Sequence, residues 1–139
     1  MVDVAADGRL VTDAALALLR NAGLTVGDGE APRDAVSHYA IVYPVSTVMA
    51  GTMESPYADA ERTVQVQSVG TTREQAQWVA DEVSIILLGT PHRTIELTGR
   101  ALTGAIRYAG GTGVRRDDDT ANPSLFFATD RFVFPTTPA

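Results

Sequence analysis

The segment RTVQVQSVGTTREQAQWVADEVSIILLG, residues 62–89, carries the strongest secondary-structure signals in this 139-residue chain. Its first part alternates valine with glutamine over residues 62–69, which is typical of a β-strand with one apolar and one polar face. The glycine that follows ends the strand. Thr71 and Glu74 then have the spacing of a capping box, and apolar residues recur with helical periodicity beyond them. The stretch therefore predicts a strand followed at once by a helix over residues 72–88.

The last turn of this helix is unusually apolar. Ile85 to Leu88 are all large aliphatic residues, so the turn is apolar on nearly every side. One helix stripe packed on one sheet does not account for such a turn. We therefore expect a second surface to cover this end of the helix.

Outward from this unit, the sequence predicts one more helix and several more strands. The helix is expected over about residues 13–22, and strands over 37–45, 93–97, 104–109 and 124–134. Pro44 should mark the edge or the end of its strand. Turn residues predict a loop over 27–32, a long loop over 46–60 and a charged loop or arm over 110–123.

This order of elements predicts the α+β class. We expect a mixed, mostly antiparallel β-sheet flanked by two main α-helices, with the long loop and the charged arm as its irregular parts. The length of 139 residues fits one domain, so residues 1–139 are expected to fold as a single unit. The four phenylalanines lie between positions 126 and 134 and are expected mainly in the core.

Composition excludes several classes of protein. The apolar stretches are far shorter than the roughly 20 residues that cross a bilayer, so no membrane span is expected. The N-terminus carries Asp3 and Asp7 in place of the basic region of a secretory signal. Because the chain has no cysteine, disulfides, thiol nucleophiles and zinc fingers are excluded.

The charge balance argues against a protein that grips nucleic acid. The formal net charge is −6, and all eleven basic residues are arginines. Tight binding to DNA phosphates needs a basic face, which the sequence does not indicate. The chain can lie beside DNA without holding it.

Candidates for catalysis are few. His38 opens an apolar strand and His92 follows a proline just after the long helix, which are settings typical of structural histidines. The chain contains no nucleophile elbow, no His-Glu-x-x-His motif and no P-loop. We therefore expect no catalytic, cofactor-binding or metal-binding residue.

Two local patterns resemble ligand sites and are better explained otherwise. The glycine-rich run at 110–113 leads into arginines and acids, whereas a phosphate-binding loop must open a helix. The acids Asp117, Asp118 and Asp119 lack the spacing of a calcium loop. Beside Arg115 and Arg116 they are expected to form ion pairs within the arm or with a neighbouring chain.

The order and spacing of these segments resemble a known family. A short helix precedes HYAIVYP (38–44), RTVQVQSVG runs into TTREQA and the long helix, and RRDDD (115–119) precedes FFATDRF (126–132). This arrangement resembles the tail-terminator proteins of long, non-contractile-tailed bacteriophages, particularly those of actinobacterial hosts. The resemblance covers most of residues 10–137.

The resemblance implies a structural virion protein and no enzyme. It implies a homohexameric ring at the head-proximal end of the tail tube, assembled in the host cytoplasm, which stops tube polymerisation and receives the head connector. The implied partners are further copies of the chain, the tail tube protein and the head-tail connector or stopper protein. DNA passes through the lumen of the ring without specific binding, and no membrane is involved.

A ring of identical subunits joins two different patches of the chain. Under the resemblance, we expect contacts with subunits or partners from the long loop, the apolar helix end and the charged arm. The candidate interface residues are Met49, Met53, Tyr57, Ile85, Leu88, Arg115, Arg116, Asp117, Asp118 and Asp119.

Alternative functions stay open at this stage. A head-completion or stopper protein of the neck is also small and forms rings. A small α+β enzyme would need a concave pocket that contains His38 or His92 beside a carboxylate. A monomeric ligand-binding module would use the apolar helix end as a pocket wall.

Overall fold

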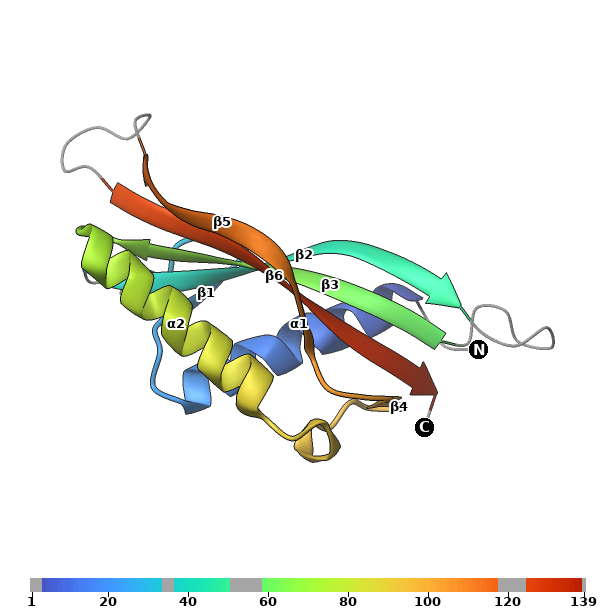
Figure 1. Ribbon diagram of the computed structural model, residues 1–139. Coiled ribbons are helices and arrows are strands. Elements are labelled where there is room, and N and C mark those ends of the chain that lie inside the picture. Colours follow the sequence, from blue (N-terminus) through green and yellow to red (C-terminus); the bar gives the residue numbers. More distant parts are fainter. Residues whose placement is uncertain (1–3, 34–36, 51–58, 118–124, 139) are drawn as a thin grey trace.

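The computed structural model describes residues 4–33, 37–50, 59–117 and 125–138, and shows two long helices on one face of a mixed sheet (Figure 1). The elements in chain order are α1 (Val4–Asn21), β1 (Val26–Asp28), β2 (His38–Ala50), β3 (Asp59–Gly70), α2 (Arg73–Gly89), the 3₁₀ helix η1 (His92–Thr94), β4 (Arg100–Leu102), β5 (Arg107–Asp117) and β6 (Leu125–Pro138). This architecture confirms the predicted α+β class.

The sheet has the strand order β1-β2-β3-β6-β4, and β5 also pairs with β6. Only the pair β1 and β2 is parallel; the other described pairs are antiparallel. Both β4 and β5 lie on the side of β6 that faces away from β3, because Thr136 pairs with Ala60 of β3 and with Leu102 of β4. The sheet therefore ends in β1 and β2 at one edge and in β4 and β5 at the other.

The hairpin of β2 and β3 is longer than the sequence predicted. Its register runs from His38 opposite Gly70 to Ala50 opposite Asp59, so part of the expected loop over 46–60 is strand. The strand passes through Pro44, with a bulge between Pro44 and Ser46. Since β1 pairs only with residues 40–42, Pro44 lies where β2 forms the sheet edge, as its missing N–H requires.

The segment after α2 differs most from the expectation. The predicted strand over 93–97 is wrong: the chain forms η1, and Gly99, with φ of 74°, then turns it so that Leu97 bridges Arg100. Residues 107–109 of the predicted strand over 104–109 and the first part of the predicted arm form a single strand, β5, whereas residues 104–106 are not strand. Two register shifts against β6, one at Gly110 and Gly111, let this glycine-rich segment stay in the sheet.

Two further boundaries differ at the N-terminal side. The helix α1 begins at Val4, well before the expected start at residue 13, because Leu10 and Val11 extend its buried stripe. The strand β1 occupies part of the expected loop over 27–32, and its three residues are too few to leave a periodic pattern. The last strand runs to Pro138 and not to residue 134.

The helix α2 begins as predicted, with the capping contacts displaced by one residue. Thr72 is the N-cap, and its side chain accepts a hydrogen bond from the backbone N–H of Gln75 (3.2 Å). In turn, Oε1 of Gln75 accepts a hydrogen bond from the backbone N–H of Thr71 (2.9 Å). At the other end, the Thr90 hydroxyl donates to the carbonyl of Ile86 (2.6 Å). The capping pair is therefore Thr72 and Gln75, whereas the sequence indicated Thr71 and Glu74.

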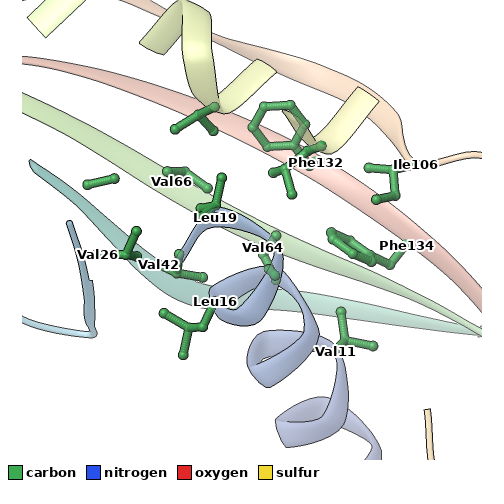
Figure 2. Packing of buried hydrophobic residues seen from close by; sticks show 14 of the residues in the cluster. Val11, Leu16, Leu19, Val26, Val42, Val64, Val66, Ile106, Phe132 and Phe134 are labelled. Atoms are coloured by element: carbon green, nitrogen blue, oxygen red, sulfur yellow. The ribbon is translucent and has the colours of Figure 1, made fainter. Parts of the chain in front are cut away.

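The core lies between the helices and the sheet face that they cover (Figure 2). Leu16 and Leu19 of α1 point onto Val42 and Val64, while Val79 and Val83 of α2 belong to the same cluster. Phe132 and Phe134 of β6 are fully buried at its centre, which confirms the core role predicted for two of the four phenylalanines. Burial of these side chains is the main source of stability for the fold.

Candidate functional site

The outer side of α2 carries a row of residues that points away from the core. Glu74, Trp78, Asp81, Ile85 and Leu88 recur at helical spacing, and we call them the α2 stripe. Trp78 is 49% exposed, Ile85 65% and Leu88 42%. The opposite side of the helix is buried in the core. The sequence predicted Ile85 and Leu88 as contact residues; it missed Trp78, although the same spacing connects the three.

A shallow hollow lies at the N-terminal end of the α2 stripe. It has a volume of about 300 Å³ and is lined by His38, Glu74, Gln75 and Trp78. The His38 ring meets Trp78 edge-on, with 5.5 Å between the ring centres. Its Nδ1 lies 3.0 Å from the Ser37 hydroxyl. His92 lies in η1, away from these four residues in the chain and outside the hollow.

The sheet face opposite the helices is a second broad surface, which we call the open sheet face. No described helix or strand lies over it (Figure 1). Ile41, Val69 and Val133 lie on it, and although buried they do not belong to the core cluster. The strand registers place these residues on the open sheet face: Tyr39, Ile41, Tyr43, Val48, Asp59, Glu61, Thr63, Gln65, Gln67, Val69, Arg107, Thr112, Arg115, Phe127, Thr129, Arg131, Val133, Pro135 and Thr137.

Charges are unevenly distributed over the open sheet face. Arg107, Arg115 and Arg131 lie along β5 and β6. The two acids among its described residues, Asp59 and Glu61, lie at the start of β3. Glu61 pairs with Arg107 (3.1 Å), whereas Nε of Arg131 donates to the neutral amide oxygen of Gln65 (3.3 Å). The part of this face beyond that ion pair is therefore aromatic, amide-rich and basic.

The structure separates the two arginines that the sequence grouped in one arm. Arg115 lies opposite Phe127 on the open sheet face, and Arg116 lies opposite Phe126 on the helix side of the sheet. Neighbouring residues of a strand point to opposite faces, so the two arginines lie on opposite faces of the sheet. Asp117 is the last residue of β5.

For several predicted contact residues, the structure describes the backbone alone or does not describe the residue. Met49 lies in β2 with its backbone opposite Ala60. Met53, Tyr57, Asp118 and Asp119 lie outside the described residues. Their roles stay predictions from the sequence.

A polar cleft of about 310 Å³ is lined by residues of α2, β5 and β6, and Asp130 is one of them. Asp130 is 9% exposed, and its Oδ1 accepts a hydrogen bond from the Tyr108 hydroxyl (2.7 Å). Burial raises the pKa of Asp130 above its ordinary value, because the charged form loses water. The hydrogen bond from Tyr108 acts in the opposite direction, and the negative charge of Asp81 on α2 raises the pKa further. Sequence reasoning missed this group, since its burial depends on α2.

The raised pKa of Asp130 makes one contribution to stability depend on pH. The folded chain holds this proton more tightly than the unfolded chain, so the contribution is full at acid pH and is lost as the pH rises through the folded pKa. Asp130→Asn does not lose this contribution as the pH rises. The free energy of unfolding of the variant, relative to that of wild type, is therefore expected to rise between pH 3 and pH 7. Urea unfolding at both pH values measures the difference.

Two neighbours of Asp130 provide matched controls with opposite signs. Tyr108→Phe removes the hydrogen bond and is expected to raise the pKa of Asp130, whereas Asp81→Asn removes a like charge and is expected to lower it. An NMR titration of the Asp130 carboxyl in each variant measures the two changes in its pKa. Equal shifts of the same sign would contradict this assignment.

Gly111 permits the close approach of β5 to Asp130. A Cβ added at Gly111 would overlap Oδ1 of Asp130 and the backbone oxygen of Thr129, and would lie 2.8 Å from the Tyr108 hydroxyl. Gly111→Ala is therefore expected to lower the free energy of unfolding by about 1–3 kcal/mol. Gly113→Ala is the control, because nothing lies within 4 Å of its added Cβ. Urea unfolding of the two variants should differ clearly; equal losses would show that Gly111 is not restricted by packing.

Among residues 4–33, 37–50, 59–117 and 125–138, no three His, Asp or Glu side chains gather as metal ligands would. No helix of the described chain is long and apolar enough to cross a membrane. The α2 stripe and the open sheet face both expose large apolar side chains, namely Trp78, Ile85 and Leu88 on the first and Val48 on the second.

Comparisons with known proteins bear on the fold. No protein-family model and no curated protein matches the sequence. A solved structure described as the virion of a native gene transfer agent (GTA) particle contains a similar chain, with a TM-score of 0.65 and 17% identity. The match covers 86% of this chain and 84% of that chain. A match to a chain of a second solved structure covers 97% of this chain and 93% of that chain, at 20% identity and with a TM-score of 0.45.

Proposed function

We propose that the chain is a structural protein of a phage or phage-like virion, and that it caps the head-proximal end of the tail tube as a ring. In this role it ends tube polymerisation and forms the docking surface for the head connector. The observation that carries the proposal is the fold shared with a chain of a gene transfer agent virion over most of its length. The sequence resemblance to tail-terminator proteins supports the finer role.

The distribution of exposed groups supports an assembly protein. A subunit of a cyclic ring needs two different patches, one for each neighbour, and further surface for the layers above and below it. The α2 stripe exposes Trp78, Ile85 and Leu88, and the open sheet face is a broad surface on the other side of the chain. Exposed apolar groups in this number are typical of surfaces that a partner covers.

The proposed partners are further copies of the chain in a homohexamer, the tail tube protein and the head-tail connector or stopper protein. The chain is acidic, with a formal net charge of −6. Like charges repel, so acids that line the lumen would let DNA pass through it without binding.

Deletion of the gene from the phage that encodes the chain tests this function. We expect tails of uncontrolled length and heads without tails, because nothing would stop the tube or receive the head. A plasmid copy of the wild-type gene should restore normal particles. Normal tails and joined heads in the deletion strain would overturn the proposal.

The setting of His38 in the hollow beside Glu74 allows a test of the alternative that the chain is an enzyme. Nδ1 of His38 faces the Ser37 hydroxyl, and its ring packs against Trp78, which is a structural setting. Replacement of His38 and His92 together by asparagine is expected to leave complementation of the deletion strain unchanged. Thermal unfolding of the purified variant serves as the folding control. Loss of complementation by a folded variant would favour a catalytic role.

A further inference from the structure

The α2 stripe combines apolar bulk with negative charge. Trp78, Ile85 and Leu88 supply the apolar surface, and Glu74 and Asp81 lie between and beside them on the same side of the helix. The stripe contains no basic residue. A surface that covers it must offer apolar contact and positive charge together.

The open sheet face offers that combination. Tyr39 of β2, Val69 of β3, Phe127 of β6 and Arg115 of β5 lie in one row across the four strands. Arg131 lies between this row and the ion pair of Arg107 with Glu61, and its Nε donates to the neutral amide oxygen of Gln65. The aromatic and basic part of the sheet thus complements the apolar and acidic stripe of the helix.

The dimensions of the two surfaces also agree. The 17 residues of α2 give a helix about 25 Å long. Four strands at a spacing of about 4.8 Å make a face roughly 15–20 Å wide. One helix can therefore lie across all four strands and reach the aromatic row and Arg131 together.

Charge favours the pairing of the stripe with the sheet face over a contact between two identical surfaces. A contact between two α2 stripes would bring Glu74 and Asp81 of both copies onto one seam. A contact between two open sheet faces would bring the arginines of β5 and β6 together. Like charges that face each other across an interface are unfavourable, and opposite charges select the partner and its orientation.

We infer that the α2 stripe of one copy docks on the open sheet face of the next copy. The inference rests on the proposed function and names the contact between neighbouring subunits of the ring. The two surfaces lie on opposite sides of one chain, so each copy can use both at once. Such a head-to-tail contact propagates around a closed ring.

Pairs of single cysteines test the contact, and the chain has no native cysteine to interfere. Two copies are joined by a flexible Gly/Ser linker of about 30 residues, whose r.m.s. span of about 30 Å brings the copies to millimolar effective concentration. One copy carries Ile85→Cys on the stripe and the other carries Gln67→Cys in the middle of the open sheet face. A short bis-maleimide reagent then reports how fast the two thiols are joined.

Three matched tandem proteins serve as controls. The first carries Ile85→Cys in both copies, and the second carries Gln67→Cys in both copies. The third pairs Gln67→Cys with Ala31→Cys, because Ala31 is exposed in the loop after β1 and does not belong to the stripe. We expect the pair of positions 85 and 67 to cross-link about ten-fold faster than any control. The excess should shrink in 1 M salt, where charges are screened beyond about 3 Å.

Each of the other outcomes overturns the inference. Faster linkage between two copies of position 85 would show that helices meet, and faster linkage between two copies of position 67 would show that sheets meet. Rates equal to the Ala31 control would show that the two surfaces do not contact each other. The assay uses purified protein, so its result is independent of the gene deletion that tests the virion role.

Discussion

Phe132→Ala is expected to lower the free energy of unfolding by about 3–5 kcal/mol, the range for removing a fully buried phenylalanine. Phe132 is 0% exposed and lies between both helices and the sheet, where Tyr108 also meets its ring at 5.7 Å between ring centres. The loss combines the transfer of apolar surface to water with the cavity that remains. Urea unfolding followed by circular dichroism measures the change.

Phe127→Ala is the matched control for this prediction. Phe127 belongs to the same strand but lies on the open sheet face, outside the core cluster. Its removal is expected to cost less than half as much, because its side chain is partly exposed and leaves no closed cavity. Equal losses at the two positions would mean that the sheet face opposite the helices is buried in the isolated chain.

Ile85→Glu is expected to abolish assembly while leaving the fold intact. A carboxylate at this position stays in water in the free chain, since Ile85 is 65% exposed, and stability should change by less than about 0.5 kcal/mol. In an assembled particle the substitution would remove the apolar contact of Ile85, and the new carboxylate would have to lose its water. We therefore expect affinity to fall roughly 100-fold or more, and a plasmid copy of the variant to fail in the deletion strain.

Ala17→Glu provides the control for added negative charge. Ala17 is exposed on α1, so the variant carries the same extra charge on a helix surface outside the α2 stripe. It is expected to complement the deletion like wild type. Failure of both variants would indicate a general effect of charge, and success of Ile85→Glu would remove the α2 stripe from the assembly surface.

Local patterns in the sequence predicted the central elements well. The valine and glutamine alternation of β3 and the long apolar period of α2 are strong because each extends over several turns or residue pairs. The short strands β1 and β4 have three residues each and leave no period to detect. The sequence predicts part of β5 as an arm, since its glycines favour loops and only pairing with β6 keeps them in the sheet.

The functional surfaces were less accessible from the sequence. Ile85 and Leu88 were identified because the end of α2 carries more apolar surface than one face can bury. The sequence does not reveal the open sheet face, because its residues are defined by the register of four strands and by the packing of both helices on the opposite face. The burial of Asp130 depends in the same way on contacts between distant segments, and no local pattern around it distinguishes it from an exposed acid.

Averaged electron microscopy of intact particles locates this chain in the virion. We predict density for it as a single six-fold layer between the last ring of the tail tube and the head connector. A layer beside the portal would assign the chain to head completion instead. Absence of the chain from purified particles would contradict a structural role in the virion altogether.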